Sequence, residues 1–362
     1  MPNVRVDLEH CGYDVMVEPG CMLSAGDQIA AANFSGRAAL ITDANVARHH
    51  AEPVMLSLHQ AGFDPSCHLV PAGEGSKCLE QLENLCRSLA ESRHDRRSFV
   101  VALGGGVVGD LAGFTAAVFF RGIPLVQIPT TIVSQVDSSI GGKTGVNIPE
   151  GKNLVGSFHQ PGLVLVDPDS LRTLPDREFR EGFAEAIKHA AIRDAAMLDE
   201  LAALDPRSRA VPADLIARNL AIKARIVEED ERETAGTRAL LNFGHTIGHG
   251  IEAAVPYGAL LHGEAIALGI RAALSLSEQY CQLDPAASRR ILDLLAKFSL
   301  PLTLPPEVDP DAVMEKLARD KKFAGGAVRF VVLDAPGHAR VTNQIPLDAL
   351  RTAIDALRTD PA

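Results

Sequence analysis

Three histidines and several carboxylates in the second half of the chain have the types and spacing of metal ligands. His245 and His249 lie four residues apart, so they share one face of a helix, and His262 and Glu264 follow in a Leu-His-Gly-Glu sequence. Further upstream, Glu185 stands in an Ala-Glu-x-x-Lys sequence of helical character. Imidazole nitrogens and one carboxylate are a usual ligand set for a catalytic zinc ion. We therefore predict a divalent metal site, although the spacing does not decide which two histidines bind, and Glu264 is a further candidate.

Plainer interpretations of these histidines exist. A lone histidine is more often a hydrogen-bonded core or surface residue than a ligand, but three in so short a segment favour a metal. The sequence His-Thr-Ile-Gly-His lacks the glutamate that acts as general base in His-Glu-x-x-His metalloproteases. This difference argues against a metalloprotease.

A glycine-rich turn in the first half of the chain has the spacing of a dinucleotide-binding motif. Gly104, Gly106 and Gly109 follow an apolar, strand-like run and precede a helix-like segment. Glycines let the backbone approach a pyrophosphate, and the amide groups of a helix N-terminus stabilise its charge. The pattern predicts a dinucleotide site, and its alternative is an ordinary strand-to-helix turn.

Other polar residues are expected at the same edge, because open parallel sheets bind ligands at the carboxyl ends of their strands. No acidic residue ends the next strand, as the ordinary Rossmann pattern would require, and Thr130 and Thr131 stand there instead. Asp43 ends an earlier strand, where it could bind a ribose or cap the following helix. The sequence favours neither interpretation of Asp43.

The segment 136–153 is the densest polar stretch of the chain, and we predict a lysine-rich loop there. Its Gly-Gly-Lys-Thr sequence, which contains Lys143, resembles the end of a P-loop, but the first glycine of that motif is missing. An NTPase is therefore rejected. Lys143 and Lys152 on a glycine-rich backbone still suit a phosphate or a carboxylate, and the alternative is a solvated surface loop.

The pattern of apolar residues predicts two domains, with a boundary between residues 176 and 177. Before it, strand-like and helix-like segments alternate, as in a parallel sheet covered by helices. The strands are expected at 4–8, 13–17, 38–42, 99–103, 124–128 and 163–166, and the helices near 46–61 and 79–92. After it, helical spacing dominates over 183–201, 212–229, 240–254, 263–282, 286–298 and 347–357, with one hairpin at 328–333 and 339–342.

The composition restricts the classes of partner. The 362 residues carry a net charge of −11, which argues against a nucleic-acid surface, because such a surface needs a basic face. No apolar run has membrane-spanning length, and the six cysteines show no Cys-x-x-Cys spacing. We expect a cytoplasmic protein with reduced thiols, no membrane partner and a small-molecule substrate.

Taken together, these segments resemble the 3-dehydroquinate synthase family over nearly the whole chain. The resemblance is carried by segments that occur in the family's order, namely 103–113, 121–122, 129–144, 151–161, 182–188, 230–233, 238–249, 261–264 and 319–322. It implies an α/β, Rossmann-like amino-terminal domain that binds NAD and a mostly α-helical carboxyl-terminal domain that binds a divalent metal, zinc or cobalt. It also implies a homodimer.

The resemblance also assigns roles to single residues. It makes Glu185, His245 and His262 the metal ligands and moves His249 to the substrate. The NAD site would be lined by Asp43, Glu74, Lys77, Gly106, Val107, Asp110, Thr130, Thr131, Asp137, Ser138, Lys143 and Lys152. The phosphate, carboxylate and hydroxyls of the substrate would be held by Arg121, Lys143, Asn153, Lys188, Lys223, Arg238, Asn242, His249 and Lys321.

The reaction implied by the resemblance belongs to the shikimate pathway of aromatic amino-acid biosynthesis. It converts 3-deoxy-D-arabino-heptulosonate 7-phosphate to 3-dehydroquinate and phosphate through transient oxidation by NAD, β-elimination, reduction and an intramolecular aldol closure. The alternatives are a valiolone or inosose synthase, a metal-dependent polyol dehydrogenase, or a non-catalytic NAD- or metal-binding module. One departure from the family pattern is Gly250, which stands inside a helix where alanine is common and costs about 0.5–1 kcal/mol.

Overall fold

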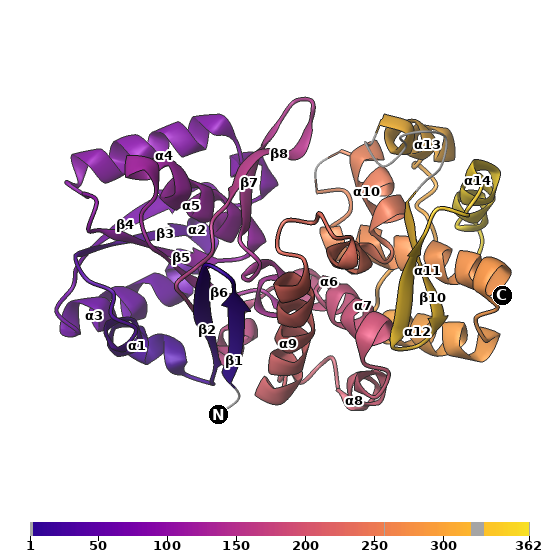
Figure 1. The fold of residues 1–362 in the computed structure, drawn as a ribbon, viewed down its shortest axis with the longest axis horizontal. Coiled ribbons are helices and arrows are strands. Elements are labelled where there is room, and N and C mark those ends of the chain that lie inside the picture. The colour runs from indigo at the N-terminus through magenta and orange to yellow at the C-terminus, as the bar shows by residue number, and fades with distance from the viewer. Residues whose placement is uncertain (1–2, 257, 320–328, 362) are drawn as a thin grey trace. The chain divides into compact units, whose positions relative to one another are not determined.

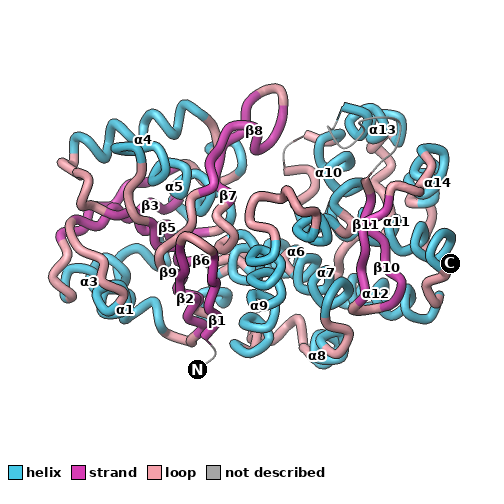
Figure 2. Tube along the Cα trace, in the orientation of Figure 1, coloured by secondary structure: helices cyan, strands magenta, loops and turns pink. Residues whose placement is uncertain are grey.

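A seven-stranded sheet organises the first half of the chain (Figures 1 and 2). In this computed structural model its strand order is β1-β2-β9-β6-β5-β3-β4, and every neighbouring pair is parallel except β1 and β2. The strands are β1 (Asn3–Leu8), β2 (Cys11–Val17), β3 (Arg37–Asp43), β4 (Asp64–Val70), β5 (Phe99–Gly104), β6 (Leu125–Pro129) and β9 (Leu163–Val166). The predicted Rossmann-like sheet is therefore confirmed.

The structure describes residues 3–256, 258–319 and 329–361, which divide into two compact units. Unit 1 contains the described residues up to Pro175 together with Arg209–Glu228, and unit 2 contains Asp176–Ser208 and the described residues from Glu229 onward. Within the described residues, no helix is long and apolar enough to cross a membrane.

Helices cover both faces of the sheet in unit 1 (Figure 1). On β5, Phe99, Val101 and Leu103 point into one apolar core, and Val100 and Ala102 point into the other, as the two-residue period of a strand requires. One core lies under α1 (Ala25–Ala31) and α3 (Glu52–Gln60), and the other under α4 (Leu79–Glu91) and α5 (Gly106–Val118). Burial on both faces explains why the strand reads as one continuous apolar run.

Unit 2 is mostly helical, as predicted, with one antiparallel hairpin of β10 (Phe330–Ala335) and β11 (His338–Thr342). Its helices are α6 (Asp176–Glu181), α7 (Phe183–Arg193), α8 (Met197–Ala203), α10 (His245–Ala254), α11 (His262–Cys281), α12 (Pro285–Lys297), α13 (Pro310–Arg319) and α14 (Leu347–Ala356). Helix α9 (Ala213–Glu229) groups with unit 1 except for its last residue. A Cβ on Gly250 of α10 would lie 3.0 Å from Leu317 of α13, so the glycine permits close helix packing.

Several predicted elements differ from the structure. The lysine-rich segment is not a loop: after a helical turn at Ser134–Ser138 it forms an antiparallel hairpin of β7 (Lys143–Ile148) and β8 (Gly151–Phe158). Strand β4 and helix α1 were not predicted. The helix expected at 183–201 is split into α7 and α8, and the helix expected to begin at residue 240 begins at His245, after a 3-10 turn.

A partly buried hydrogen-bonded network joins β4 to the helix that covers it. The hydroxyl oxygen of Ser66 lies 2.7 Å from Nε2 of His68 and 2.6 Å from Nε2 of His94, and Nδ1 of His68 lies 2.7 Å from Oγ of Ser88. The Ser66 hydroxyl can donate its proton to one of the two imidazoles and accept a hydrogen bond from the other. Neutral rings, which each have one donor and one acceptor nitrogen, fit this arrangement. Burial lowers the pKa of His68, and burial together with His68 lowers the pKa of His94 to about 4.

We predict that this network makes unit 1 sensitive to mild acid. The unfolded chain, whose histidine pKa is near 6.5, binds protons more readily than the folded chain. The contribution of the neutral histidines to the free energy of unfolding is therefore fully present above pH 6.5 and is lost as the pH falls towards 4. For His94 the loss is on the order of 2 kcal/mol. The free energy of unfolding, measured with urea at pH 7.5 and pH 5, should change less with pH in His94→Asn than in the unaltered chain. In the control His59→Asn, at an exposed position, it should change as much as in the unaltered chain. An equal change in all three proteins would contradict the prediction.

Candidate active site

Two histidines and a glutamate from three helices meet in unit 2. Glu185 lies on α7, His245 begins α10 and His262 begins α11. Nε2 of His245 lies 3.4 Å from Oε1 of Glu185, and Nε2 of His262 lies 3.3 Å from the same oxygen. One potential ligand atom from each residue falls within a common 4.8 Å. The side chain of Glu185 is completely buried.

The charges around Glu185 compensate for its burial. Burial alone would raise the pKa of this carboxyl, but the ammonium of Lys188, one helical turn away, and His245 hold it well below its usual range. Burial lowers the pKa of His245. Burial also opposes the charge on His262, yet Glu185 and Glu252 raise the pKa of this imidazole to about 10. The cluster therefore keeps a buried carboxylate ionised and attracts positive charge.

The donor set fits a divalent metal ion. Both carboxylate oxygens of Glu185 are buried, and neither has a hydrogen-bond partner of good geometry among the described residues, although Lys188 contacts one of them. A buried carboxylate without such partners is costly unless a cation satisfies it. Two imidazole nitrogens and one carboxylate oxygen suit zinc, and they leave a coordination position open. Glu185, His245 and His262 would hold the ion.

Glycines set the distance between the two helices that carry the histidines. A Cβ on Gly269 of α11 would lie 1.9 Å from the carbonyl oxygen of Gly244, and a Cβ on Gly248 would lie 3.0 Å from the carbonyl oxygen of Ala265. Gly244, which precedes α10, has a φ of 77° and would also meet Ile270. The contacts show that the helices run antiparallel, which brings the carboxyl-terminal part of α10 beside His262.

The first turn of α11 is fixed by carboxylates. The amide of Gly263 donates to Oε2 of Glu181 at 2.6 Å, and burial raises the pKa of Glu181 to about 7. Glu264 accepts the amide of Leu261 at 2.8 Å and forms a two-pronged ion pair with Arg177. The prediction of Glu264 as a candidate ligand is therefore wrong: its carboxylate caps the helix on which His262 lies.

Two further candidate residues of unit 2, Arg238 and Asn242, follow a loop that Asp230 organises. Its carboxylate accepts four backbone amides, from Thr234, Ala235, Gly236 and Arg238, at 2.7 to 3.1 Å. Burial opposes the charge, but these amides hold the pKa of Asp230 at about 2. Arg238 and Asn242 lie in the 3-10 turn that follows, at Thr237–Asn242. The ring of His249 lies 5.1 Å from that of His245, and Lys321 lies outside the described residues.

In unit 1 the glycine turn lies at the carboxyl end of β5. Helix α5 begins at Gly106, directly after the turn, so its first amides face the same edge as the end of the strand. A Cβ on Gly105 would lie 2.9 Å from Thr131, and one on Gly106 would lie 3.2 Å from the hydroxyl of Ser138. Val107 belongs to the first turn of α5, and Thr130 follows β6 at the same edge.

Polar residues from other elements lie at this edge. Asp43 caps the short helix α2 (Ala44–Val46), because its Oδ1 accepts the amides of Asn45 and Val46 at 2.7 and 3.1 Å. Lys77 forms an ion pair with Asp110 of α5, and Asn147 donates to Glu74 at 2.8 Å. Asp137 forms an ion pair with Lys223 of α9, whose Nζ also donates to the backbone oxygen of Asp137 at 2.8 Å.

The β7–β8 hairpin separates the other lysines. Lys143 is the first residue of β7 and is exposed, whereas Lys152 and Asn153 lie near the turn at the other end of the hairpin. Asn153 adopts a φ of 56°, which asparagine tolerates better than most residues, and its amide donates to Asn147 at 2.9 Å. The hairpin therefore presents cationic groups at both of its ends.

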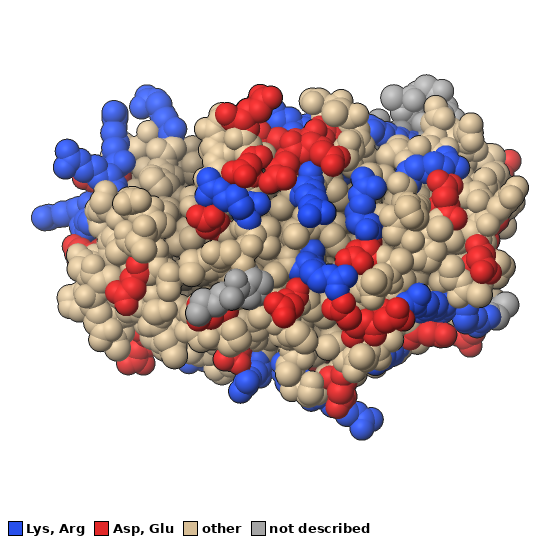
Figure 3. Space-filling model, turned by 60° about the horizontal axis from the view of Figure 1, so that its bottom comes forward, with Lys and Arg blue, Asp and Glu red and all other residues tan. Residues whose placement is uncertain are grey.

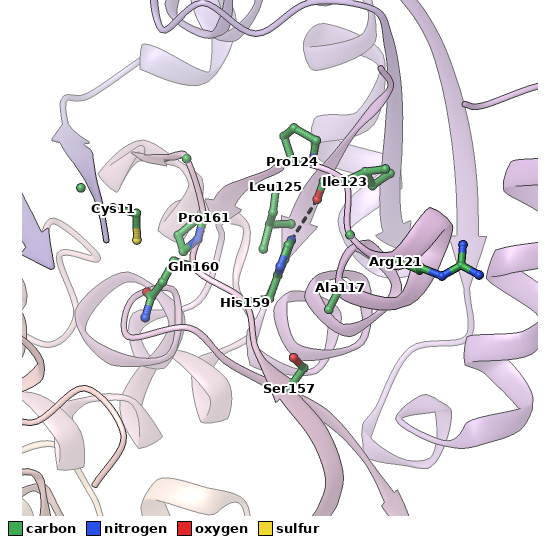
Figure 4. Close-up of a pocket in the computed structure, with 13 residues that line it drawn as sticks. Cys11, Ala117, Arg121, Ile123, Pro124, Leu125, Ser157, His159, Gln160 and Pro161 are labelled. Carbon is green, nitrogen blue, oxygen red and sulfur yellow. Dashed lines mark hydrogen bonds between the residues drawn. The ribbon is translucent and has the colours of Figure 1, made fainter. Parts of the chain in front are cut away.

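Arg121 lies apart from the glycine turn, at the opposite edge of the sheet. It lines a cavity of about 570 Å³ at the amino-terminal ends of β6 and β9, together with Cys11, His159 and Gln160 (Figure 4). His159 is tied to the carbonyl oxygen of Ile123 at 2.9 Å, and the guanidinium of Arg121 points away from Cys11 and Gln160. Within unit 1, Arg121 is thus not brought together with the residues of the glycine turn.

Charged side chains of both signs are interspersed over the face shown in Figure 3, despite the net negative charge. On this acidic protein, positive charge is therefore found at particular positions, such as the lysines at the two ends of the β7–β8 hairpin.

Comparison with known proteins assigns the family. The model of the 3-dehydroquinate synthase N-terminal region matches residues 67–181, and that of the C-terminal region matches residues 182–323. The chain belongs to the 3-dehydroquinate synthase family. It is 46% identical to the 3-dehydroquinate synthase of Symbiobacterium thermophilum, over 96% of this chain and 98% of the relative. It is 44% identical to that of Pelobacter propionicus, over 95% and 96% of the two chains.

Solved structures agree with this family in fold. A 2-epi-5-epi-valiolone synthase from Streptomyces hygroscopicus, with NAD⁺ and Zn²⁺ bound, has a TM-score of 0.88 at 30% identity, covering 97% of this chain and 98% of that one. A 2-deoxy-scyllo-inosose synthase complexed with carbaglucose-6-phosphate, NAD⁺ and Co²⁺ has a TM-score of 0.87 at 24% identity, over 97% and 99% of the two chains. This second likeness shows the fold alone.

Sequence reasoning missed three carboxylates that support the site: Glu181, Asp230 and Glu252. The Ile-Glu pair after the second histidine of α10 was a usable signal, since it places Glu252 one turn after His249. Asp230 belongs to a segment that carries the resemblance, but spacing gave it no role, because its four partners are backbone amides of the loop that follows. Glu181 acts on α11 across a tertiary contact that spacing does not reveal.

We predict that His262→Ala loses the metal and keeps the fold. The variant removes one of three ligands at the start of a helix, where the side chain is about one-third exposed, so the core is not disturbed. Elemental analysis of the purified protein should fall from about one metal per chain to nearly none. His338→Ala, at an exposed position on β11, is the matched control. An His262→Ala protein with full metal content would remove His262 from the ligand set.

Proposed function

We propose that this chain acts as a 3-dehydroquinate synthase, a phosphate-eliminating carbon–oxygen lyase that depends on NAD and a divalent metal. The observation that carries the proposal is the match of both halves of the chain to this family. The buried Glu185 beside two imidazoles supports a metal-dependent reaction. Relatives at 44–46% identity over nearly the full chain bear the same name.

The two cofactors divide between the two parts of the chain. Residues 1–176 bind NAD at the glycine-turn edge, and residues 177–362 bind zinc or cobalt through Glu185, His245 and His262. Bound NAD⁺ would accept a hydride from the substrate, and the NADH formed would return it later, so no net redox change results. The metal supplies Lewis-acid polarisation of a substrate oxygen. The twelve residues assigned to NAD by the family resemblance are proposed to line its site, and Asp43 can do so while it caps α2, because both bonds of the cap use Oδ1.

The side chains of the protein bind and orient a sugar-acid phosphate. Lys143, Lys188, Lys223, Arg238 and Lys321 are proposed to hold its anionic groups, and Asn153, Asn242 and His249 its oxygens. Arg121 lies at the opposite edge of the sheet in the same chain, so it is proposed to join them only from a second copy of the chain. Arginine and lysine suit phosphate and carboxylate through charge-assisted hydrogen bonds. The Asp230 loop supports this role, because it fixes the backbone of Arg238 before any ligand binds. Such preorganisation lowers the cost of orienting the substrate.

The decisive assay follows phosphate and NADH together. With 3-deoxy-D-arabino-heptulosonate 7-phosphate, the NAD- and metal-loaded protein should release inorganic phosphate over many turnovers with no net NADH, and a chelator should abolish the release. Net NADH without phosphate would identify a polyol dehydrogenase. Phosphate release only from a different sugar phosphate would identify a valiolone or inosose synthase, and NAD binding with no turnover would favour a non-catalytic module.

We infer that the active form is a homodimer in the cytoplasm. Val118, Phe120, Leu154 and Phe158 are 41–59% exposed, and they lie at the end of α5, in the turn after it and on the hairpin that packs against α5. Phe120 is held outward by a φ of 49°, a strained value for an aromatic residue. An exposed apolar patch of this kind suits a second copy of the chain. All six cysteines are free thiols, which suits a reducing compartment.

We predict that Leu154→Glu weakens self-association. A carboxylate within an apolar contact between two copies loses its hydration, so the dimer dissociation constant should rise about tenfold or more. Sedimentation velocity over a concentration series measures this change, and Leu69→Glu, at an exposed leucine on β4, is the control. A monomeric unaltered chain, or equal association of both variants, contradicts the dimer.

A further inference from the structure

Glu252 lies on the far side of the His262 ring from Glu185. Nδ1 of His262 is 3.6 Å from Oε2 of Glu252, whereas Nε2 of the same ring is 3.3 Å from Glu185. The Glu252 side chain is 12% exposed, so water only partly screens the pair. The distance is an ion-pair distance, and a side-chain adjustment of about half an ångström brings the two atoms into hydrogen-bond range.

The helix packing described above places Glu252 there. Gly248 and Gly269 hold α10 and α11 in backbone contact, and the two helices run antiparallel. The last turns of α10 therefore lie beside the first turn of α11. Glu252 reaches His262 from one direction, while α7 brings Glu185 from the other. The imidazole of His262 on α11 is thus held between two carboxylates, one on α7 and one on α10.

We propose that Glu252 is a positioning residue that orients His262 and makes it a stronger metal ligand. This inference rests on the proposed metal site. A carboxylate that accepts the Nδ1 hydrogen fixes the ring in the tautomer whose Nε2 lone pair faces Glu185, and it raises the electron density on that nitrogen. Carboxylate–histidine pairs of this kind typically contribute 10- to 100-fold to metal affinity.

A second metal ion is the competing occupant of this place. His249, Glu252 and His262 also bring one ligand atom each within 4.8 Å of one another. Such an ion would need Nδ1 of His262, and the first metal needs Nε2, so the ring would have to lose both of its protons. A proton shared between Nδ1 and Glu252 avoids this demand. A shared proton predicts one metal ion per chain, whereas a second metal ion predicts two.

Metal affinity, measured without any substrate, tests the proposal. The metal-free protein is titrated with Zn²⁺ in competition with a chromogenic chelator, and bound metal per chain is determined by elemental analysis. For Glu252→Ala we expect one metal per chain and an affinity 10- to 100-fold weaker than in the unaltered chain. Glu252→Gln keeps an acceptor but no charge, so its loss should be smaller, and Glu252→Asp should recover part of the affinity.

Glu278→Gln is the matched control, because it removes the same charge from α11 four turns beyond His262. Affinities of the Glu252 variants within twofold of the unaltered chain would overturn the proposal, and so would an equal loss in Glu278→Gln. Two metals in the unaltered chain, one of them lost in Glu252→Gln, would establish a second metal site instead. A metal-free Glu252→Gln that fails to fold would show a purely structural role. None of these results depends on phosphate release, so failure of the proposed activity remains distinguishable.

Discussion

A single buried carboxylate sets the conditions for the second half of this protein. Glu185 has no contact with solvent, and an isolated charge in that position would cost several kcal/mol. The surrounding helices each bring a group that offsets this cost: Lys188 from the same helix, His245 from α10 and His262 from α11. The buried charge of Glu185 therefore creates a site that attracts a dication. The packing of the helices brings the other groups of that site to it.

Support for the cluster comes from outside its ligands. Glu181, Glu264 and Arg177 fix the start of α11, while Gly244 and Gly269 fix its distance from α10. In unit 1, by contrast, the edge proposed for NAD includes the glycine turn and the first amides of α5. The two proposed sites thus differ in part: one offers fixed side-chain charges to a cation, and the other offers helix-terminal amides to an anion.

The sequence was sufficient where a short pattern determines the structure. The buried run at Phe99–Leu103 and the glycines after it predicted a strand, a turn and a helix, and the structure has them. Tertiary relations were less accessible. Spacing offered His245 and His249 as a pair on one face, whereas the grouping with His262 depends on how α10 packs on α11. The β7–β8 hairpin was hidden by its lysines and glycines, and β4 by Pro65 and by polar residues that form the histidine–serine network.

The glycine contact between α10 and α11 has a consequence for how this site can vary. Side-chain packing normally leaves some freedom, since a larger residue at one position is accommodated by a smaller one opposite. Here the carbonyl oxygen of Gly244 lies where a Cβ of residue 269 would be, so the spacing of the histidine-bearing helices is set by main-chain atoms. The separation of the ligands therefore depends on the absence of a side chain at residue 269, because even the methyl group of alanine there would push α10 and α11 apart.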